Sequence, residues 1–306
     1  MSKISKTIKI SISHEEWLKA KKINFSEWVR QKLDAEINQQ LRSGNRNKFK
    51  AVILAAGKDT TLFPLTNDIP KALLDIKGKS ILQRQVEMLR TVGINDIAVV
   101  RGYKKDQINF PNLEYFDNDD YENTGILVSL FLAREFMDKD MIILYGDILF
   151  EIDILKRLIE TRHDTTLVVD RGWKKRYQVS HEEHPFAPEL TRLSEKEQEI
   201  EISSVGIGMP ETNSTSEFIG LAKLSTNACS ILKDLYKNVY CINQNKKFHQ
   251  AKQIRTASFL DFIQELLDRG EKVAALEIWR AWIDIDTFED YRNAWKSFSE
   301  VVPNKE

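Results

Sequence analysis

The chain has few cysteines and no long hydrophobic segment. Its 306 residues include two cysteines, Cys229 and Cys241, which do not form a CxxC pair. This content predicts reduced thiols and argues against a disulfide framework. No apolar run reaches the roughly 18 residues of a membrane-spanning helix, and the N-terminus lacks the apolar core of a signal peptide. The sequence therefore predicts a cytoplasmic protein.

The charges are distributed unevenly along the chain. Residues 1–50 contain 12 Lys or Arg and 5 Asp or Glu, a net charge of +7, whereas the remaining residues contain 33 and 41, a net charge of −8. The hydrophobic content of 42% and the charged content of 30% are ordinary for a globular protein. The length suits one large domain or two smaller ones, and the charge asymmetry predicts two modules with different partners.

The N-terminal segment, residues 1–46, has a pattern of its own. Residues 6–13, KTIKISIS, alternate in the strand period and place three isoleucines on one face. Ser13 and Ser26 are candidate N-caps for two following helices. A strand followed by two helices resembles the ribbon-helix-helix module, in which two chains pair their strands. We therefore expect a homodimer through residues 1–46.

A second interpretation of this segment is DNA binding. The outward strand face, Thr7, Lys9 and Ser11, and the positive charge would suit a DNA major groove and its phosphates. A basic dimerisation module is the favoured interpretation, and DNA binding stays open as the alternative. Residues 42–48 are expected to be a flexible linker.

The stretch from Phe49 to Leu82 organises the rest of the chain. An apolar run, Ala51–Leu54, predicts a buried parallel strand that ends in small residues and a loop, Lys58–Thr61. Small residues at a strand end allow phosphate groups to approach free backbone N–H groups. Lys71 follows Pro70 and is a candidate cation for a phosphate.

The segments after this stretch alternate between strand and helix patterns. A helix is expected over residues 80–92, strands over 96–100, 113–116 and 141–145, and a helix near 126–136. This alternation favours a mostly parallel sheet with right-handed crossovers. Ligands bind at the carboxyl ends of such strands, where Gly57, Gly102 and Asp147 fall. Residues 171–192 are polar and are expected to form a loop or lid.

Several linear motifs resemble one enzyme superfamily. The patterns L-A-A-G, P-L-T, P-K and K-G-K-x-I-L, followed by W-x-D-x-x-T-x-E-D-Y at Trp282–Tyr291, are similar to those of the sugar-nucleotide and cytidylyl transferases. The resemblance implies a Rossmann-like α/β nucleotidyltransferase fold for residues 49–300. It also implies that a phosphate or phosphonate oxygen attacks the α-phosphorus of a nucleoside triphosphate and releases pyrophosphate.

The resemblance assigns roles to individual residues. Lys71 and Lys58 are the expected catalytic cations, and Mg²⁺ is the expected cofactor, bound by carboxylates of Asp147, Asp284 and Asp286. The expected nucleotide-binding residues are Leu54, Ala55, Ala56, Gly57, Gly102, Thr124 and Gly146. Because the attacking oxygen is already ionised, positioning and charge neutralisation suffice for catalysis.

The segments 99–103, 123–125 and 144–147 resemble the cytidylyltransferases of phosphonate metabolism most closely. They imply CTP as the donor and 2-aminoethylphosphonate, or a phosphocholine-like phosphoamino alcohol, as the acceptor. Candidate acceptor-binding residues are Arg171, Lys174, Asp117 and Trp282. Two other functions stay open: a sugar-1-phosphate nucleotidyltransferase, and a DNA-binding regulator with a degenerate transferase domain.

One departure from the family pattern affects the phosphate loop. The family loop usually reads G-x-G-T-R, whereas this chain has Asp59 in place of the second glycine and Thr61 in place of the arginine. An acid beside a triphosphate is unfavourable unless it meets a metal ion or a cation such as Lys58. The phosphate contacts of this loop therefore cannot be copied from the family.

Overall fold

The computed structural model describes residues 24–26, 28–30, 32–33, 48–175, 186–196, 199–210 and 215–297. The predicted strand at residues 6–13 and the first predicted helix lie outside these ranges. Residues 28–30 and 32–33 of the second predicted helix are helical, and so are residues 25–26, so Ser26 lies within a helical turn and not at the predicted N-cap. Among the helices described, none combines the length and the apolar character needed to cross a membrane.

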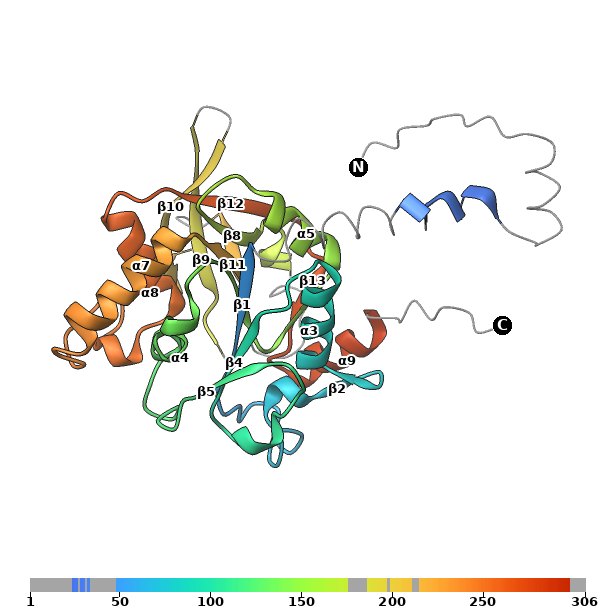
Figure 1. Ribbon diagram of the computed structural model, residues 1–306, viewed down its shortest axis with the longest axis horizontal. Helices are drawn as coiled ribbons and strands as arrows, with labels where there is room; N and C mark the ends of the chain where they lie inside the picture. The colour runs from blue at the N-terminus through green and yellow to red at the C-terminus, as the bar shows by residue number, and fades with distance from the viewer. Residues whose placement is uncertain are drawn as a thin grey trace.

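A nine-stranded sheet runs through the molecule (Figure 1). Its strand order is β5 (Glu114–Asp117), β4 (Ile97–Arg101), β1 (Phe49–Ala55), β6 (Asp140–Tyr145), β11 (Ser216–Leu224), β8 (Thr165–Asp170), β12 (Val273–Ile278), β10 (Glu199–Ile207) and β9 (Glu189–Lys196). β1 pairs in parallel with β4 and β6, β4 with β5, and β8 with β12. β11 is inserted antiparallel between β6 and β8. β10 pairs antiparallel with both β12 and β9, so four of the eight neighbouring pairs are parallel. The predicted α/β fold is confirmed, with its parallel pairs in β5–β4–β1–β6 and in β8–β12.

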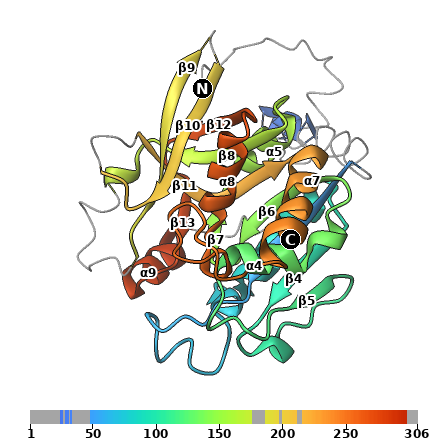
Figure 2. The same cartoon turned by 90° about the vertical axis from the view of Figure 1, so that its left-hand side faces the viewer.

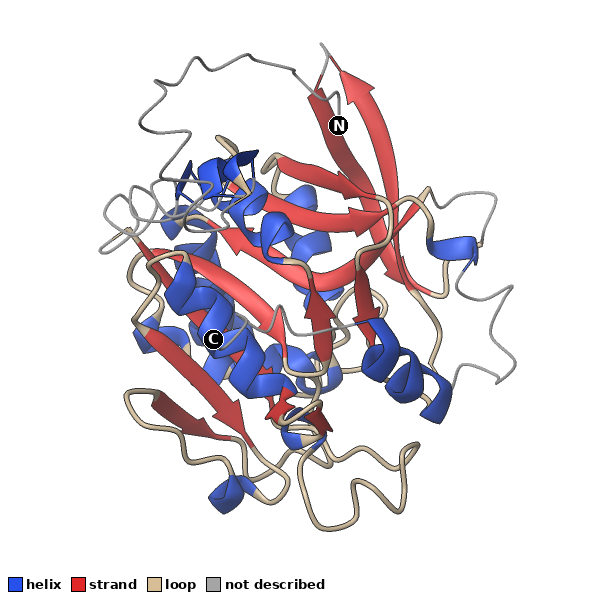
Figure 3. Cartoon of the chain, turned by 90° about the vertical axis from the view of Figure 1, so that its right-hand side faces the viewer, coloured by secondary structure: helices blue, strands red, loops and turns tan. Residues whose placement is uncertain are grey.

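Helices cover both faces of this sheet. On one face lie α4 (Ile126–Leu132), α7 (Thr226–Leu235) and α8 (Phe259–Asp268), and on the other lie α3 (Ile81–Thr91) and α5 (Ile152–Glu160) (Figures 1 and 3). The alternation along β1 explains both cores: Val52 and Leu54 pack in the first, whereas Ala51 and Ile53 pack in the second. A strand buried on both faces must be apolar throughout, as the sequence of β1 is.

Short elements complete the fold beside the strand ends. β7 (Ile148–Phe150) pairs antiparallel with β13 (Trp282–Asp284), and β2 (Asp75–Ile76) pairs with β3 (Lys79–Ser80). Helix α9 (Phe288–Ser297) ends the described chain. Single 3₁₀ turns occur at Lys71–Leu73, Lys105–Gln107, Arg134–Phe136 and Ile254–Thr256, and a π-helical turn at Tyr236–Tyr240 extends α7.

The segment expected as a loop over residues 171–192 is only partly a loop. Strand β9 begins at Glu189 and forms a long hairpin with β10, which reaches beyond the rest of the sheet (Figure 2). Its N-terminal end also pairs with β11, through Thr191 and Leu190. The sequence of β9, ELTRLSEK, contains only two apolar residues, Leu190 and Leu193, and their spacing of three does not follow the strand period. Its strand character was therefore missed.

Candidate active site

Three acidic side chains meet beyond the carboxyl ends of the central strands. Leu54 of β1 lies opposite Tyr145 of β6, and Asp147 follows Tyr145 by two residues. The β7–β13 pairing places Asp284 opposite Ile148, next to Asp147. One carboxylate oxygen from each of Asp147, Asp284 and Asp286 lies within 4.8 Å of the other two. Segments more than 130 residues apart in sequence thus converge, as the motifs predict.

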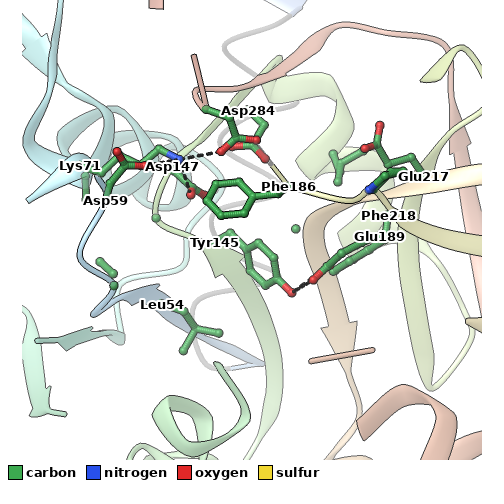
Figure 4. Close-up of a pocket in the computed structure, with 18 of the residues that line it drawn as sticks. Leu54, Asp59, Lys71, Tyr145, Asp147, Phe186, Glu189, Glu217, Phe218 and Asp284 are labelled. Carbon is green, nitrogen blue, oxygen red and sulfur yellow. Dashed lines mark hydrogen bonds and ion pairs between the residues drawn. The ribbon is translucent and has the colours of Figure 1, made fainter. Parts of the chain in front are cut away.

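Lys71 projects into this acidic cluster from the 3₁₀ turn that follows Pro70 (Figure 4). Its Nζ lies 2.8 Å from Oδ1 of Asp286 and 3.1 Å from Oδ2 of Asp147. The side chain is buried, and burial by itself lowers the pKa of a lysine. The negative charges of the surrounding aspartates outweigh burial and hold the pKa of Lys71 well above its ordinary value. Lys71 is therefore a fixed positive charge at the centre of the site.

The acidic cluster suits a divalent cation. Oδ1 of Asp147 is buried, and none of the residues that the structure describes donates a hydrogen bond to it. A buried carboxylate oxygen without a donor is costly unless a cation approaches it. Carboxylate oxygens are also the ligands that Mg²⁺ prefers. The residues present therefore fit the expected magnesium site.

The loop that departs from the family pattern is ordered by its own side chains. The Asp59 carboxylate accepts a hydrogen bond from the Leu62 backbone N–H at 2.9 Å and lies 3.4 Å from Nζ of Lys71. The Thr61 hydroxyl lies 3.1 Å from Oδ1 of Asp59 and 2.7 Å from the backbone oxygen of Asp286. The acid thus meets a cation, but that cation is Lys71 and not Lys58.

Two adjoining cavities open beside the cluster, of about 440 and about 190 Å³. Leu54, Gly57, Tyr145 and Asp147 line both. Of the other expected nucleotide-binding residues, Ala55 and Gly146 line the larger cavity, and Ala56 and Thr124 line the smaller one. The strand ends thus form one continuous site with two compartments.

Gly102 lies directly behind the smaller compartment. A Cβ at this position would approach the Ala56 carbonyl oxygen to 2.4 Å and Cβ of Tyr121 to 2.9 Å. Only a glycine allows β4 and β1 to end this close together, and both neighbours line the smaller cavity. Gly102 therefore shapes the compartment without lining it.

The expected acceptor-binding residues are divided. Trp282 lines the larger cavity, and its Nε1–H donates to Oδ2 of Asp170 at 2.9 Å. Arg171 forms an ion pair with Glu277 at 3.1 Å, and Lys174 stacks over the Trp173 ring. Neither is among the described residues that line these two cavities.

Two further expected residues have charged neighbours of their own. Asp117 forms ion pairs with Arg101 at 2.9 Å and with Lys105 at 3.3 Å. It does not line either of the two cavities. Lys58 does line the larger cavity, with its Nζ 3.6 Å from Glu122. The structure thus brings Lys58 and Trp282 to the site, but not Arg171, Lys174 or Asp117.

The larger cavity contains two acids that the motifs did not indicate, Glu189 and Glu217 (Figure 4). The Tyr145 hydroxyl donates to the Glu189 carboxylate at 3.0 Å. Burial raises the pKa of Glu189 to about 8, against the hydrogen bond from Tyr145, and the negative charge of Glu217 adds to the rise. Aromatic rings of Phe186 and Phe218 line the same region.

The sequence contains a signal for only one of these two acids. Glu217 opens the predicted return strand EFIGLAKL, where an acid at the start of an apolar strand is unusual. Glu189 lies in a polar stretch with no periodicity, so the sequence does not single it out.

Residues 51–205, half of the chain, match the family model of the MobA-like NTP transferase domain. CTP:phosphoglutamine cytidylyltransferase of Campylobacter jejuni is 30% identical over 253 residues, which cover 79% of this chain and 97% of that protein. CMP-5'-(3-aminopropyl)phosphonate synthase of Streptomyces rubellomurinus is 31% identical over 130 residues, or 40% of this chain and 21% of that protein. A glucose-1-phosphate uridylyltransferase is also among the similar proteins.

A solved structure shares the fold. That of CTP:phosphocholine cytidylyltransferase from Streptococcus pneumoniae superposes with a TM-score of 0.59 at 20% identity, over 81% of this chain and 98% of the other. The family match and the full-length similarity to the Campylobacter protein agree with this likeness. The chain belongs to the family of proteins with a MobA-like NTP transferase domain and is a nucleotidyltransferase.

Proposed function

We propose that the protein is a cytidylyltransferase that transfers CMP from CTP to a small phosphonate or phosphate carrying an amino group, with 2-aminoethylphosphonate as the best candidate. The observation that carries this proposal is the convergence of Lys71 with Asp147, Asp284 and Asp286, at a point where Asp147 lines both cavities. One compartment can hold the nucleoside and the other the acceptor, with the reacting phosphorus where they meet. CTP as the donor is supported by the similarity to CTP:phosphoglutamine cytidylyltransferase and to CMP-5'-(3-aminopropyl)phosphonate synthase.

The residues of the site suggest how the chain would carry out this reaction. The acceptor's oxygen bonds to the α-phosphorus of CTP, and the bond from that phosphorus to pyrophosphate breaks. Nζ of Lys71 can donate to the α-phosphate and to the incoming oxygen, which holds two anionic groups together. Mg²⁺ bound by Asp147, Asp284 and Asp286 would neutralise phosphate charge. No proton has to be removed from the acceptor, so no general base is required.

The end of the larger cavity supports an acceptor with an ammonium group. Glu189 and Glu217 bring two carboxyl groups into a half-apolar compartment whose walls include Phe218 and Trp282. A cation is attracted both by carboxylates and by the faces of aromatic rings. Burial is the main cause of the raised pKa of Glu189, with the charge of Glu217 adding to it, and an ammonium group beside Glu189 would favour its ionised carboxylate. A sugar hydroxyl gains much less from these two acids.

We also propose that residues 1–46 form a dimerisation module beside the transferase domain of residues 49–300. The support is the alternation of isoleucines in residues 6–13. Light scattering on the full chain should give twice the mass of 35.6 kDa. A monomeric mass across the tested concentrations would reject this part of the proposal.

The transferase proposal can be tested with purified full-length protein, CTP and Mg²⁺. The acceptors are 2-aminoethylphosphonate, phosphocholine, phosphoethanolamine, glucose 1-phosphate and ethylphosphonate, which lacks the amino group. Mass spectrometry of the products should show a CMP adduct and pyrophosphate with 2-aminoethylphosphonate, and much less product with ethylphosphonate. Asp147→Asn should abolish transfer, whereas Asp234→Asn, a matched change at an exposed position of α7, should not. Turnover with glucose 1-phosphate alone would reject the proposal in favour of a sugar nucleotidyltransferase.

A further inference from the structure

We propose that Asp59 is a positioning residue that keeps the Lys71 ammonium in place when the other acids bind a metal ion. This inference rests on the proposed function, because it assigns a role within the same site. It concerns the loop position where the family pattern has glycine and this chain has an acid.

The Asp59 side chain is fixed by its own loop. It is 8% exposed, its Oδ1 accepts from the Leu62 backbone N–H at 2.9 Å, and the Thr61 hydroxyl lies 3.1 and 3.2 Å from its two carboxylate oxygens. The Thr66 hydroxyl also donates to the Asp59 backbone oxygen at 3.1 Å. These contacts hold the Asp59 carboxylate in one position. An ion pair with this carboxylate therefore also restricts the position of the Lys71 ammonium.

Asp59 differs from the other acids around Lys71 in one respect. Among the described residues, the group able to hold a metal ion consists of Asp147, Asp284 and Asp286, and Asp59 is outside it. Among the residues that the structure describes, Lys71 has three ion-pair partners, and two of them, Asp147 and Asp286, are members of that group. A metal ion that takes their oxygens leaves Asp59, at 3.4 Å, as the ion-pair partner that does not change.

Thr61 connects this arrangement to the metal group. Its hydroxyl lies between the Asp59 carboxylate and the backbone oxygen of Asp286, at 3.1 and 2.7 Å. Its single proton is donated to one of these two acceptors at a time, and the shorter contact ties the loop after β1 to the segment after β13 where Lys71 enters. The pair Asp59 and Thr61 forms a bridge at the place where the family pattern has a glycine and an arginine.

The inference predicts a coupling between Asp59 and Lys71 in metal binding. In the metal-free protein Lys71 competes with the metal for Asp147 and Asp286, and Asp59 draws the ammonium away from them. Asp59→Asn keeps an oxygen for the Leu62 N–H but removes the charge, so it should weaken Mn²⁺ binding about tenfold, a typical coupling for charged neighbours. In a Lys71→Met background the same change should weaken Mn²⁺ binding only about twofold.

The measurement is Mn²⁺ titration by electron paramagnetic resonance without nucleotide, on the wild type, both single variants and the double variant. If Asp59→Asn weakens Mn²⁺ binding by the same factor in the wild type and in Lys71→Met, Asp59 acts on the metal directly and the proposal is overturned. Steady-state kinetics provides a second readout: Asp59→Asn should lower kcat about tenfold with little change in KM for CTP. A change in KM alone would equally contradict the positioning role.

A second variant covers the case in which Asp59→Asn does not fold. Thr61→Val removes the hydroxyl that lies between Asp59 and the Asp286 backbone oxygen. It should weaken Mn²⁺ binding in the same direction by a smaller factor, with no effect once Lys71 is Met. Because Mn²⁺ binding requires no acceptor, the outcome is separable from the proposed function. If Asp59 and Lys71 are coupled in Mn²⁺ binding but no CMP is transferred, only the proposed cytidylyltransferase function is rejected. If CMP is transferred but the two residues are not coupled, only the role of Asp59 is rejected.

Discussion

The stability of the metal-free protein should depend strongly on Lys71. Its Nζ lies 2.8 to 3.4 Å from carboxylates of Asp286, Asp147 and Asp59 in a buried position. Lys71→Met leaves these acids, and Asp284, facing one another without the ammonium. Removing one partner from a buried ion pair costs about 3–5 kcal/mol. For a domain of this size that corresponds to a fall in Tm of about 10 °C.

The same change should make the protein more responsive to divalent cations. With Lys71 gone, a metal ion no longer competes with an ammonium for Asp147 and Asp286, so Mn²⁺ should restore most of the lost stability. Thermal unfolding in EDTA and in excess Mn²⁺ measures both effects.

Lys79→Met is the matched control, because its ion pair with Glu87 at 2.9 Å is on the surface and should be worth at most about 1 kcal/mol. An unchanged Tm of Lys71→Met in EDTA, or a Mn²⁺ shift no larger than that of the wild type, would refute the reasoning.

Three further predictions follow from the two compartments. Glu189 has an ordinary pKa of 4.5 and a folded-state pKa of about 8, so the folded state holds its proton more tightly and wild-type stability should fall as pH rises between these values. Glu189→Gln should therefore lose less Tm than the wild type between pH 6 and pH 9, and a parallel loss would contradict the assignment. Gly102→Ala forces the Ala56 carbonyl away and should raise KM for CTP about tenfold, the effect of roughly 1–3 kcal/mol of overpacking. Initial rates at varied CTP measure this KM, and an unaltered value would contradict the close approach of β4 and β1. Gly220→Ala places a Cβ 2.7 Å from Tyr145 at a φ of +78° and should lower the free energy of unfolding by about 1–3 kcal/mol, measured by urea denaturation, with no change counting against the packing described.

The reacting centre could be predicted from the sequence because its residues lie in linear motifs at strand ends. The run Ala51–Leu54 and the small residues after it identify β1, and Asp147 follows a second buried strand. The proximity of Asp284 needs the β7–β13 pairing, which no local pattern reveals. The resemblance to the transferases implies that Asp284 lies near Asp147, and the β7–β13 pairing is the physical reason.

The acceptor end could not be predicted in this way. Arg171 and Asp117 were reasonable candidates as charged residues, but each has a nearby partner of opposite charge that only the fold shows. Glu189 reaches the cavity because the start of β9 pairs with the start of the central strand β11, and its sequence surroundings are those of a polar loop. Long-range pairing of polar strands leaves little trace in hydrophobic periodicity.

The central claim is that Lys71 and the aspartates surround the α-phosphorus of bound CTP. Diffraction from crystals grown with CTP and Mn²⁺, recorded at the manganese absorption edge, tests it directly. We expect an anomalous peak bounded by Asp147, Asp284 and Asp286, the α-phosphate within hydrogen-bonding distance of Nζ of Lys71, and the base in the compartment of Ala56 and Thr124. Cytidine density elsewhere, or a manganese peak away from Asp147, would contradict it.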